Sequence, residues 1–247
     1  MNSLSQKEIS GQLFYLSKES VKTLVLNSKC GLIIPPVRTS KKSSINDIST
    51  LNNFSPLLCL YRKASPMFIH NKTSHGFDES TFKKEISPTT NALMTLCLLE
   101  LSKYYSHFTE GNRNINSLEN AYKYLAKEQL QFYSEHLRNA EGLFVPKKNI
   151  SDGNSKGYEL VDKDNKFKFS DQAFMMDAYL LYSIYNPSDD ACEDYKIFSY
   201  EILQVFKEYK DSLYDLSFTE SIEIFLALNV FYKYSNSLIA RELILDL

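Results

Sequence analysis

The chain has 247 residues, of which 43% are hydrophobic and 23% are charged, proportions typical of a globular protein with a buried core. Its formal net charge of −2 and its pI near 6.1 exclude an overall basic field that would attract nucleic acid or an anionic membrane. No segment approaches the ~20 apolar residues that a membrane-spanning helix needs, and residues 1–20 lack the continuous apolar stretch of a signal peptide. We therefore expect a cytoplasmic protein with neither nucleic-acid nor membrane partners.

Motifs for metal, nucleotide or redox chemistry are absent from the sequence. The four cysteines are Cys30, Cys59, Cys97 and Cys192. None forms a CxxC pair, and Cys97 lies in an apolar helical stretch, so we expect it to be a buried hydrophobe. His70 and His75 do not have the spacing of an HExxH motif, so we expect no metal. The sequence also lacks GxxxxGK[ST], GxGxxG and GxSxG motifs, so we expect no cofactor.

The first third of the chain predicts an irregular region. Residues 11–27 can form one amphipathic helix, whereas the paired prolines within 31–38 require an extended segment. Residues 38–53 are polar and predict a loop, and the short apolar run 57–61 is either a strand or a buried helical turn. We expect residues 1–86 to pack on a helical core, residues 87–247, within a single domain of residues 1–247.

The rest of the chain predicts one helix after another. The expected helices span residues 87–108, 116–142, 170–185, 188–213, 217–235 and 237–247. Ser87-Pro88 and Ser170-Asp171 have the residue types that begin helices, and the SFTE sequence at 217–220 is a complete capping-box motif.

The predicted helices are of two alternating kinds. Residues 92–105, 173–185 and 222–234 are apolar on nearly every side, so we expect protein to surround each of them. Residues 118–137 and 192–213 carry one apolar stripe each and are expected to cover the outside. The stripes consist of Leu118, Ala121, Tyr122, Leu125, Gln129, Phe132 and His136, and of Tyr195, Phe198, Ile202, Val205 and Tyr209. The predicted fold is all-α, an α/α hairpin array with inner and outer helices.

A ligand site is expected at the amino-terminal ends of the inner helices. The long connections 65–87 and 141–169 each lead into such a helix end, where free backbone N–H groups and positive dipole ends gather. We expect a saccharide or an anionic small molecule to bind there. The ligand-binding candidates are Asn91, Gln172, Tyr158, His70 and His75.

Three acidic residues, Asp171, Asp177 and Glu220, are the candidate catalytic groups. A pair of carboxylates can act as general acid and base on a glycosidic bond. Asp171 and Glu220 have an alternative, structural role, because acidic residues at helix starts cap free N–H groups and offset the helix dipole. Asp177 lies mid-helix among apolar residues, so it is expected either to pair with a Tyr, Lys or Arg or to line a polar cavity.

Residues 87–235 resemble the six-hairpin, or (α/α) toroid, superfamily in their style of helix. The resemblance is carried by EGLF at 141–144, SDQAFMMDAYLL at 170–181, and SFTE at 217–220 followed by IFLALNVF at 224–231. It implies ligand binding near the inner-helix amino termini, as in the glycosidases and sugar epimerases of that superfamily. A full toroid needs six hairpins and this chain offers about three, so the resemblance implies a partial ring, open on one side or completed by another copy.

Three functions remain open on the sequence alone. The first is an enzyme, or a degenerate enzyme, that binds or processes carbohydrate at the helix ends. The second is a non-catalytic scaffold that binds a protein partner or itself as a homo-oligomer. The third is a peptide-binding repeat array, which the unequal repeat lengths disfavour.

Overall fold

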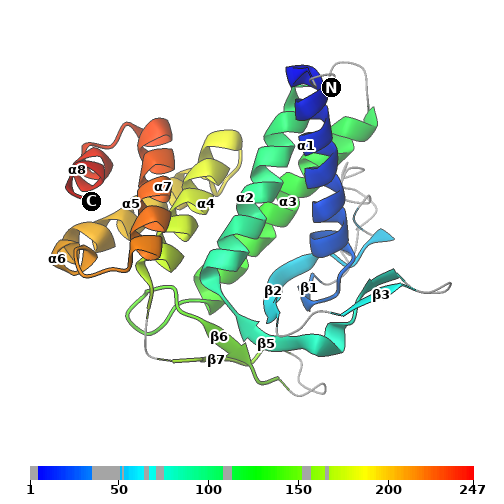
Figure 1. Ribbon diagram of the computed structural model, residues 1–247, viewed down its shortest axis with the longest axis horizontal. Coiled ribbons are helices and arrows are strands. Elements are labelled where there is room, and N and C mark those ends of the chain that lie inside the picture. The colour runs from blue at the N-terminus through cyan, green and yellow to red at the C-terminus, as the bar shows by residue number, and fades with distance from the viewer. Residues whose placement is uncertain are drawn as a thin grey trace. The chain divides into compact units, whose positions relative to one another are not determined.

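The computed structural model describes residues 5–34, 51, 53–63, 67–70, 75–107, 113–151, 157–164 and 167–247 (Figure 1). The α-helices are α1 (Gln6–Val21), α2 (Pro88–Ser106), α3 (Arg113–His136), α4 (Phe169–Tyr185), α5 (Cys192–Glu208), α6 (Lys210–Leu213), α7 (Phe218–Ser235) and α8 (Leu238–Asp246). The strands are β1 (Gly31–Ile33), β2 (Leu57–Lys63), β3 (Phe68–His70), β4 (His75–Phe77), β5 (Phe82–Ile86), β6 (Lys147–Asn149) and β7 (Leu160–Asp162). The fold is therefore mostly helical, and the all-α prediction is wrong in omitting these antiparallel strands.

The chain divides into two compact units. The first contains residues 1–83 and 100–125, and the second contains residues 84–99 and 126–247. The chain first passes from one unit to the other between residues 83 and 84 and returns to the first unit for residues 100–125. The two units are described separately below.

Aromatic packing holds α1 in the first unit. The helix begins with a complete capping box, in which Ser5 and Glu8 satisfy each other's backbone N–H groups. Phe14 stacks on Tyr104 with ring centroids 4.4 Å apart and meets Tyr105 edge-on at 5.6 Å. A π-helical turn, Lys22–Leu26, extends α1 and leads towards β1. The predicted amphipathic helix is thus confirmed, beginning five residues earlier than expected, at Gln6 in place of residue 11.

Short antiparallel strands form the rest of the first unit. Strand β1 pairs with β2, which settles the 57–61 run as a strand, and β3 pairs with β4. Gly31 is required in β1, because a Cβ atom at this position would lie 1.9 Å from the Cys59 carbonyl oxygen. The expected loop at residues 38–53 lies almost wholly outside the described residues.

Helix α4 is the centre of the second unit. It packs against α5 and α7, and α7 in turn packs against α8 (Figure 1). Fourteen of its 17 residues are buried, as the sequence predicts for an inner helix. The Tyr179 hydroxyl, fully buried, donates a 2.7 Å hydrogen bond to the Leu130 carbonyl oxygen. The aromatic bulk of α4 is therefore accommodated without leaving that hydroxyl unsatisfied.

The other two predicted inner helices are not enclosed in the same way. Ile224, Leu228 and Phe231 of α7 are buried, but a second face of the helix is exposed. In α2, Leu93 and Cys97 are exposed, so the prediction of a buried Cys97 is wrong. A helix of apolar composition tends to be covered by other segments. On α7, however, only the side that contacts α4 and α8 is buried.

The outer helices differ in how well their stripes were predicted. The α3 stripe is confirmed, since Ala121, Leu125 and Gln129 are buried. In α5 the buried face is shifted by about one residue from the predicted stripe. Ile202 and Phe206 are buried, whereas Tyr209 is exposed. One displaced position rotates a helix by ~100°, so the buried face of α5 includes Ser199 and Leu203 as well.

The long connection 141–169 is more ordered than the sequence suggested. Strand β6 pairs with both β5 and β7, with Lys147 opposite Ile86 on one side and Asp162 on the other. The buried Lys147 ammonium donates to the Arg138 carbonyl oxygen and contacts the Asp162 carboxylate. Among the described residues, no helix is both long enough and apolar enough to span a membrane.

Candidate functional site: the linked amino termini of α2, α4 and α7

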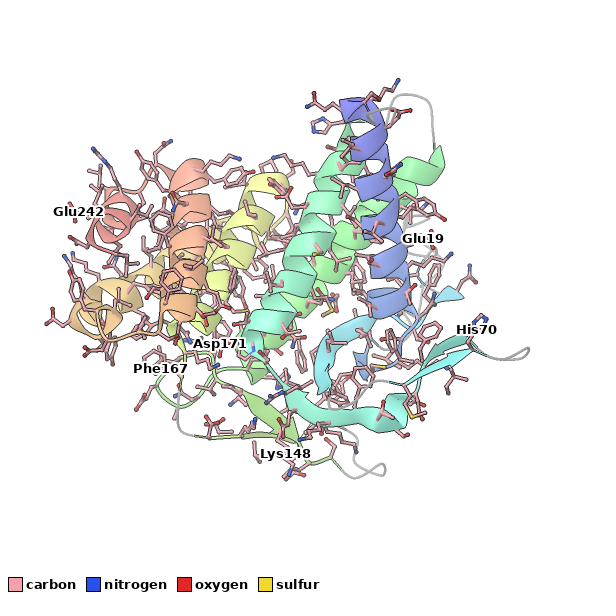
Figure 2. All side chains as sticks on the ribbon, viewed as in Figure 1. Glu19, His70, Lys148, Phe167, Asp171 and Glu242 are labelled. Atoms are coloured by element: carbon pink, nitrogen blue, oxygen red, sulfur yellow. The ribbon has the colours of Figure 1, made fainter. Side chains whose placement is uncertain are left out.

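Asp171 links the start of α4 to the start of α2, beside which it lies in Figure 2. Its Oδ1 atom accepts a 2.8 Å hydrogen bond from the Thr89 backbone N–H and a 2.6 Å bond from the Thr89 hydroxyl. Thr89 is in the first turn of α2, whose N–H groups have no partner within the helix. Asp171 thus caps a neighbouring helix and not its own.

Glu220 makes the same kind of link between α7 and α4. Its Oε1 atom accepts a 3.1 Å hydrogen bond from the backbone N–H of Phe169, the first residue of α4. Lys168, at the N-cap position of α4, provides no side-chain cap of its own. Ser217 caps α7 through the Glu220 N–H, so half of the predicted capping box is present. The other half is absent because the Glu220 carboxylate caps α4.

Gln172 fixes the connection that precedes β6. Its side-chain oxygen accepts a 3.0 Å bond from the Phe144 N–H, and its side-chain nitrogen donates a 2.7 Å bond to the Phe144 carbonyl. The amide therefore pairs with Phe144 as a neighbouring strand would. Asn91 is also buried, and its side-chain amide donates to the Ser87 carbonyl oxygen at 2.9 Å. Both amides, predicted to bind ligand, thus form hydrogen bonds with backbone groups of the protein itself.

The electrostatics at this end of the second unit are dominated by burial. Desolvation raises the pKa of Asp171, whereas the Thr89 hydrogen bonds and the nearby Lys168 lower it. The negative charge of Glu220 also raises the pKa of Asp171. Asp171 and Glu220 thus lie at the neighbouring starts of α4 and α7.

Asp177 lies apart from that pair, within the buried middle of α4. It is 2% exposed, and its Oδ1 atom has no hydrogen-bond partner among the described residues. Burial alone raises its pKa well above the ordinary value for an aspartate. A carboxyl group in these surroundings favours the neutral form, which costs less to bury than a carboxylate.

The remaining predicted ligand residues lie elsewhere. Tyr158 meets the Phe132 ring edge-on at 5.6 Å and the His136 ring at 6.5 Å, so it covers the end of α3. His70 and His75 are opposite each other in the β3–β4 hairpin of the first unit, and His70 is exposed (Figure 2). Within the described residues, no three His, Cys, Asp or Glu side chains form a group that could hold a metal ion.

A shallow, open hollow of about 330 Å³ lies on the outer face of α5. It is lined by Glu193, Lys196, Ile197, Tyr200, Glu201 and Gln204. All six residues belong to one helix, so the hollow does not enclose a ligand. It is also separate in sequence from the linked helix starts.

Two exposed apolar faces lie outside the predicted ligand site. On α7 the side chains of Phe218, Ile222, Phe225 and Leu226 are 82%, 41%, 42% and 56% exposed; we call these residues the α7 face. On α1 a second stripe consists of Ile9, Leu13 and Leu16. The available signal was the 4-3 spacing of apolar residues on each helix, which marks a seam as well as a core.

Comparison with known proteins finds no matching protein-family model, no similar curated protein and no similar solved structure. The resemblance to the six-hairpin superfamily therefore stays a prediction.

Proposed function

We propose that the chain is a non-catalytic helical interaction domain that binds a protein partner through the α7 face. The observation that carries the proposal is the exposure of four large apolar side chains side by side on one helix, ending with Leu226 at 56%. Soluble monomers rarely expose contiguous apolar patches larger than a few hundred Å², and larger patches mark interaction sites. Aromatic residues such as Phe218 and Phe225 are also enriched at interface centres.

The resemblance to a hairpin ring supports the same proposal. In that interpretation α2, α4 and α7 are inner helices of an incomplete ring, and an incomplete ring leaves an inner helix with an open flank. The enclosed α4 and the half-covered α7 fit a ring interrupted beside α7. A partner that covers this flank would bury apolar surface at roughly 25 cal/mol per Å².

The candidate catalytic acids favour a scaffold over an enzyme. Asp171 and Glu220 each satisfy a helix N–H group, which is a complete structural reason for an acid at those positions. Asp177 is buried within α4, away from solvent. A general acid or base must come within hydrogen-bond reach of the proton that it transfers, and a buried side chain does not reach a dissolved sugar.

Site-specific photo-crosslinking tests the proposal. A photoreactive amino acid is placed at Phe225 in the cells that make the chain, and a control is placed at the exposed Lys207 on α5. We expect position 225 to yield an adduct with one protein at one segment, and we expect the L226E substitution to abolish it. Adducts no stronger than those of the control, or adducts spread over many unrelated proteins, would overturn the proposal.

Carbohydrate binding at the linked helix starts is the second candidate. One observation favours it, namely that Asp171 and Glu220 lie at the linked starts of α4 and α7, where two carboxylates could act together. Titration with neutral and acidic oligosaccharides, followed by amide NMR shifts, tests it. Saturable shifts at Asp171 and Glu220 that the E220Q substitution removes would establish this candidate, and their absence would eliminate it.

A further inference from the structure

We propose that the β-strand region of the first unit docks on the surface of an anionic lipid membrane, with the exposed apolar start of the β3–β4 hairpin entering the headgroup layer. The inference is independent of the α7 face and adds a second kind of partner. It rests on the distribution of charge along the chain, on two exposed apolar side chains of the hairpin, and on basic side chains held in the same part of the unit.

Charge is distributed unevenly along the chain. Residues 22–84 contain ten Lys or Arg and three Asp or Glu, so this segment has a formal charge of +7 and the rest of the chain has −9. The net charge of −2, from which we expected no membrane partner, is therefore an average over two unlike parts. Attraction to anionic lipid falls off within a Debye length, about 10 Å, so the local charge matters more than the average.

The hairpin exposes apolar side chains at its start. Met67, directly before β3, and Phe68, the first residue of β3, are 64% and 52% exposed. The backbone here is fixed, because the Met67 carbonyl oxygen accepts a 2.8 Å hydrogen bond from the Asp78 N–H. The Phe68 ring meets the Phe77 ring edge-on, with centroids 5.3 Å apart. Both side chains can therefore leave water at a membrane interface without a change of fold.

Two exposed basic side chains lie at one end of the β1–β2 pair. The strands are joined at this end by a 2.9 Å hydrogen bond from the Tyr61 N–H to the Cys30 carbonyl oxygen. Lys29 and Arg62 are the next residues of the two segments beyond this bond, and both are exposed. The antiparallel pairing thus brings together two positive charges that are far apart in sequence.

Lys83 adds a third exposed positive charge beside the hairpin. It follows Phe82, whose ring meets an aromatic ring of β4 edge-on with centroids 6.0 Å apart, and β5 neighbours β2 in the sheet. Burial raises the pKa of the Cys30 thiol, and the charges of Glu79 and Asp78 raise it further, so the turn after β4 lies near the start of β1. Within the described part of residues 22–84 these two are the acidic residues, so basic residues prevail.

The kind of apolar side chain favours a membrane over a nucleic acid. A single-stranded nucleic acid stacks successive bases on aromatic rings, whereas only one of the two exposed side chains at the start of the hairpin, Phe68, is aromatic. A membrane interface accepts Met67 and Phe68 equally, because insertion requires apolar area and not a ring. Basic side chains beside that area match anionic headgroups.

The chain contains no tryptophan, which allows a direct test of insertion. F68W places a single indole at the hairpin, and the control F218W places one on α7, where Phe218 is 82% exposed. With phosphatidylcholine vesicles that contain about 30% phosphatidylserine, we expect the emission of F68W to shift to shorter wavelength as the indole leaves water. The emission of F218W should stay unchanged, and pure phosphatidylcholine vesicles should shift neither.

Vesicle flotation measures the contribution of the basic side chains. K83E should weaken binding to the phosphatidylserine vesicles at least about fivefold. K207E, at an exposed position of α5, changes the net charge equally and should weaken binding less than about twofold, because its charge lies outside this region. Raising the salt concentration to about 0.5 M should release the wild-type chain from the vesicles.

Several results would overturn the proposal. These are a wild-type chain that does not float with anionic vesicles, an F68W emission that does not respond to them, and equal effects of K83E and K207E. An F68W emission that responds to a single-stranded oligonucleotide and not to vesicles would assign the surface to nucleic acid. If circular dichroism shows that F68W does not fold, flotation of the wild-type chain and the lysine variants still decides. The photo-crosslink at position 225 tests the α7 face separately.

Discussion

Helices α4 and α7 are adjacent, of nearly equal length and apolar on almost every side in sequence, yet they differ in how they are covered. Fourteen of the 17 residues of α4 are buried, whereas α7 buries Ile224, Ala227, Leu228 and Phe231 and exposes Phe218, Ile222, Phe225 and Leu226. Both sequences are apolar on almost every side, so both helices favour burial against other segments. The difference lies in the neighbours, because α4 has α5 on one side and α7 on another, and α7 meets α4 and α8. Composition therefore identifies a helix that needs partners without saying whether they belong to the same chain.

The largest expected difference between the two helices is the effect of removing a leucine side chain. Leu181 in α4 is 2% exposed and Leu226 in α7 is 56% exposed. L181A should lower the free energy of unfolding by about 2–5 kcal/mol, because it leaves a cavity in a packed core. L226A should lower it by less than about 0.5 kcal/mol at protein concentrations too low for association. Urea unfolding measures both values, and similar losses would mean that α4 and α7 are equally enclosed.

The next prediction concerns Asp177, the buried carboxyl group within the otherwise apolar middle of α4, and its effect on the pH dependence of stability. Burial raises the pKa of Asp177, so the folded protein holds this proton to a higher pH than the unfolded chain does. The stability that the protonated Asp177 gives the folded protein is fully present below the pKa of this group in the unfolded chain, near 4. This stability is lost as the pH rises towards the higher pKa of the folded protein. D177N cannot ionise. Its advantage over wild type should therefore grow by about 1.4 kcal/mol per pH unit across that interval.

Urea unfolding at a series of pH values from about 4 to 8 checks this trend. Asp194, exposed at the start of α5, supplies a matched control, D194N, for loss of a surface carboxylate. A stability difference between D177N and wild type that stays constant with pH would show that Asp177 does not change its protonation over this range.

Local signals explain how much of this structure the sequence could predict. Ser87-Pro88 and Ser217 set the starts of α2 and α7 because capping depends on residues within one turn. Strands β3, β4, β6 and β7 were missed because each has three residues, too few to display an alternating pattern. Their ordering depends on pairing between segments, which one stretch of sequence does not contain.

The sequence indicated only some residues of the candidate site, and it did not indicate their contacts. Asp177, Tyr158, His70 and His75 lie apart from the linked helix starts. That Asp171 and Glu220 would lie at helix starts followed from their residue type and position. That each caps the neighbouring helix depends on how the helices pack, and so does the pairing of Gln172 with Phe144. The same limit applies to the α7 face, whose exposure is decided by neighbours and not by its own residues.

The third effect concerns the link from α4 to α2. D171A removes the acceptor of two hydrogen bonds from Thr89 at a partly buried helix start, so it should cost about 1–2 kcal/mol. D171N keeps an oxygen that can accept the Thr89 N–H bond and should cost less. Thermal unfolding of both variants makes the comparison. If D171N is as damaging as D171A, the charge of Asp171 matters and not its role as an acceptor.

The smallest expected effect is that of E220A. This substitution in α7 should change the stability of the start of α4. E220A leaves α7 its Ser217 cap but removes the acceptor for the Phe169 N–H of α4. Glu220 is half-buried, so water replaces part of this bond and the cost should be about 1 kcal/mol. Amide hydrogen exchange at Phe169 should become about fivefold faster, whereas S217A should speed exchange at the Glu220 amide of α7. If E220A instead loosens the start of α7 and leaves Phe169 protected, Glu220 serves its own helix and the link between the two does not stabilise α4.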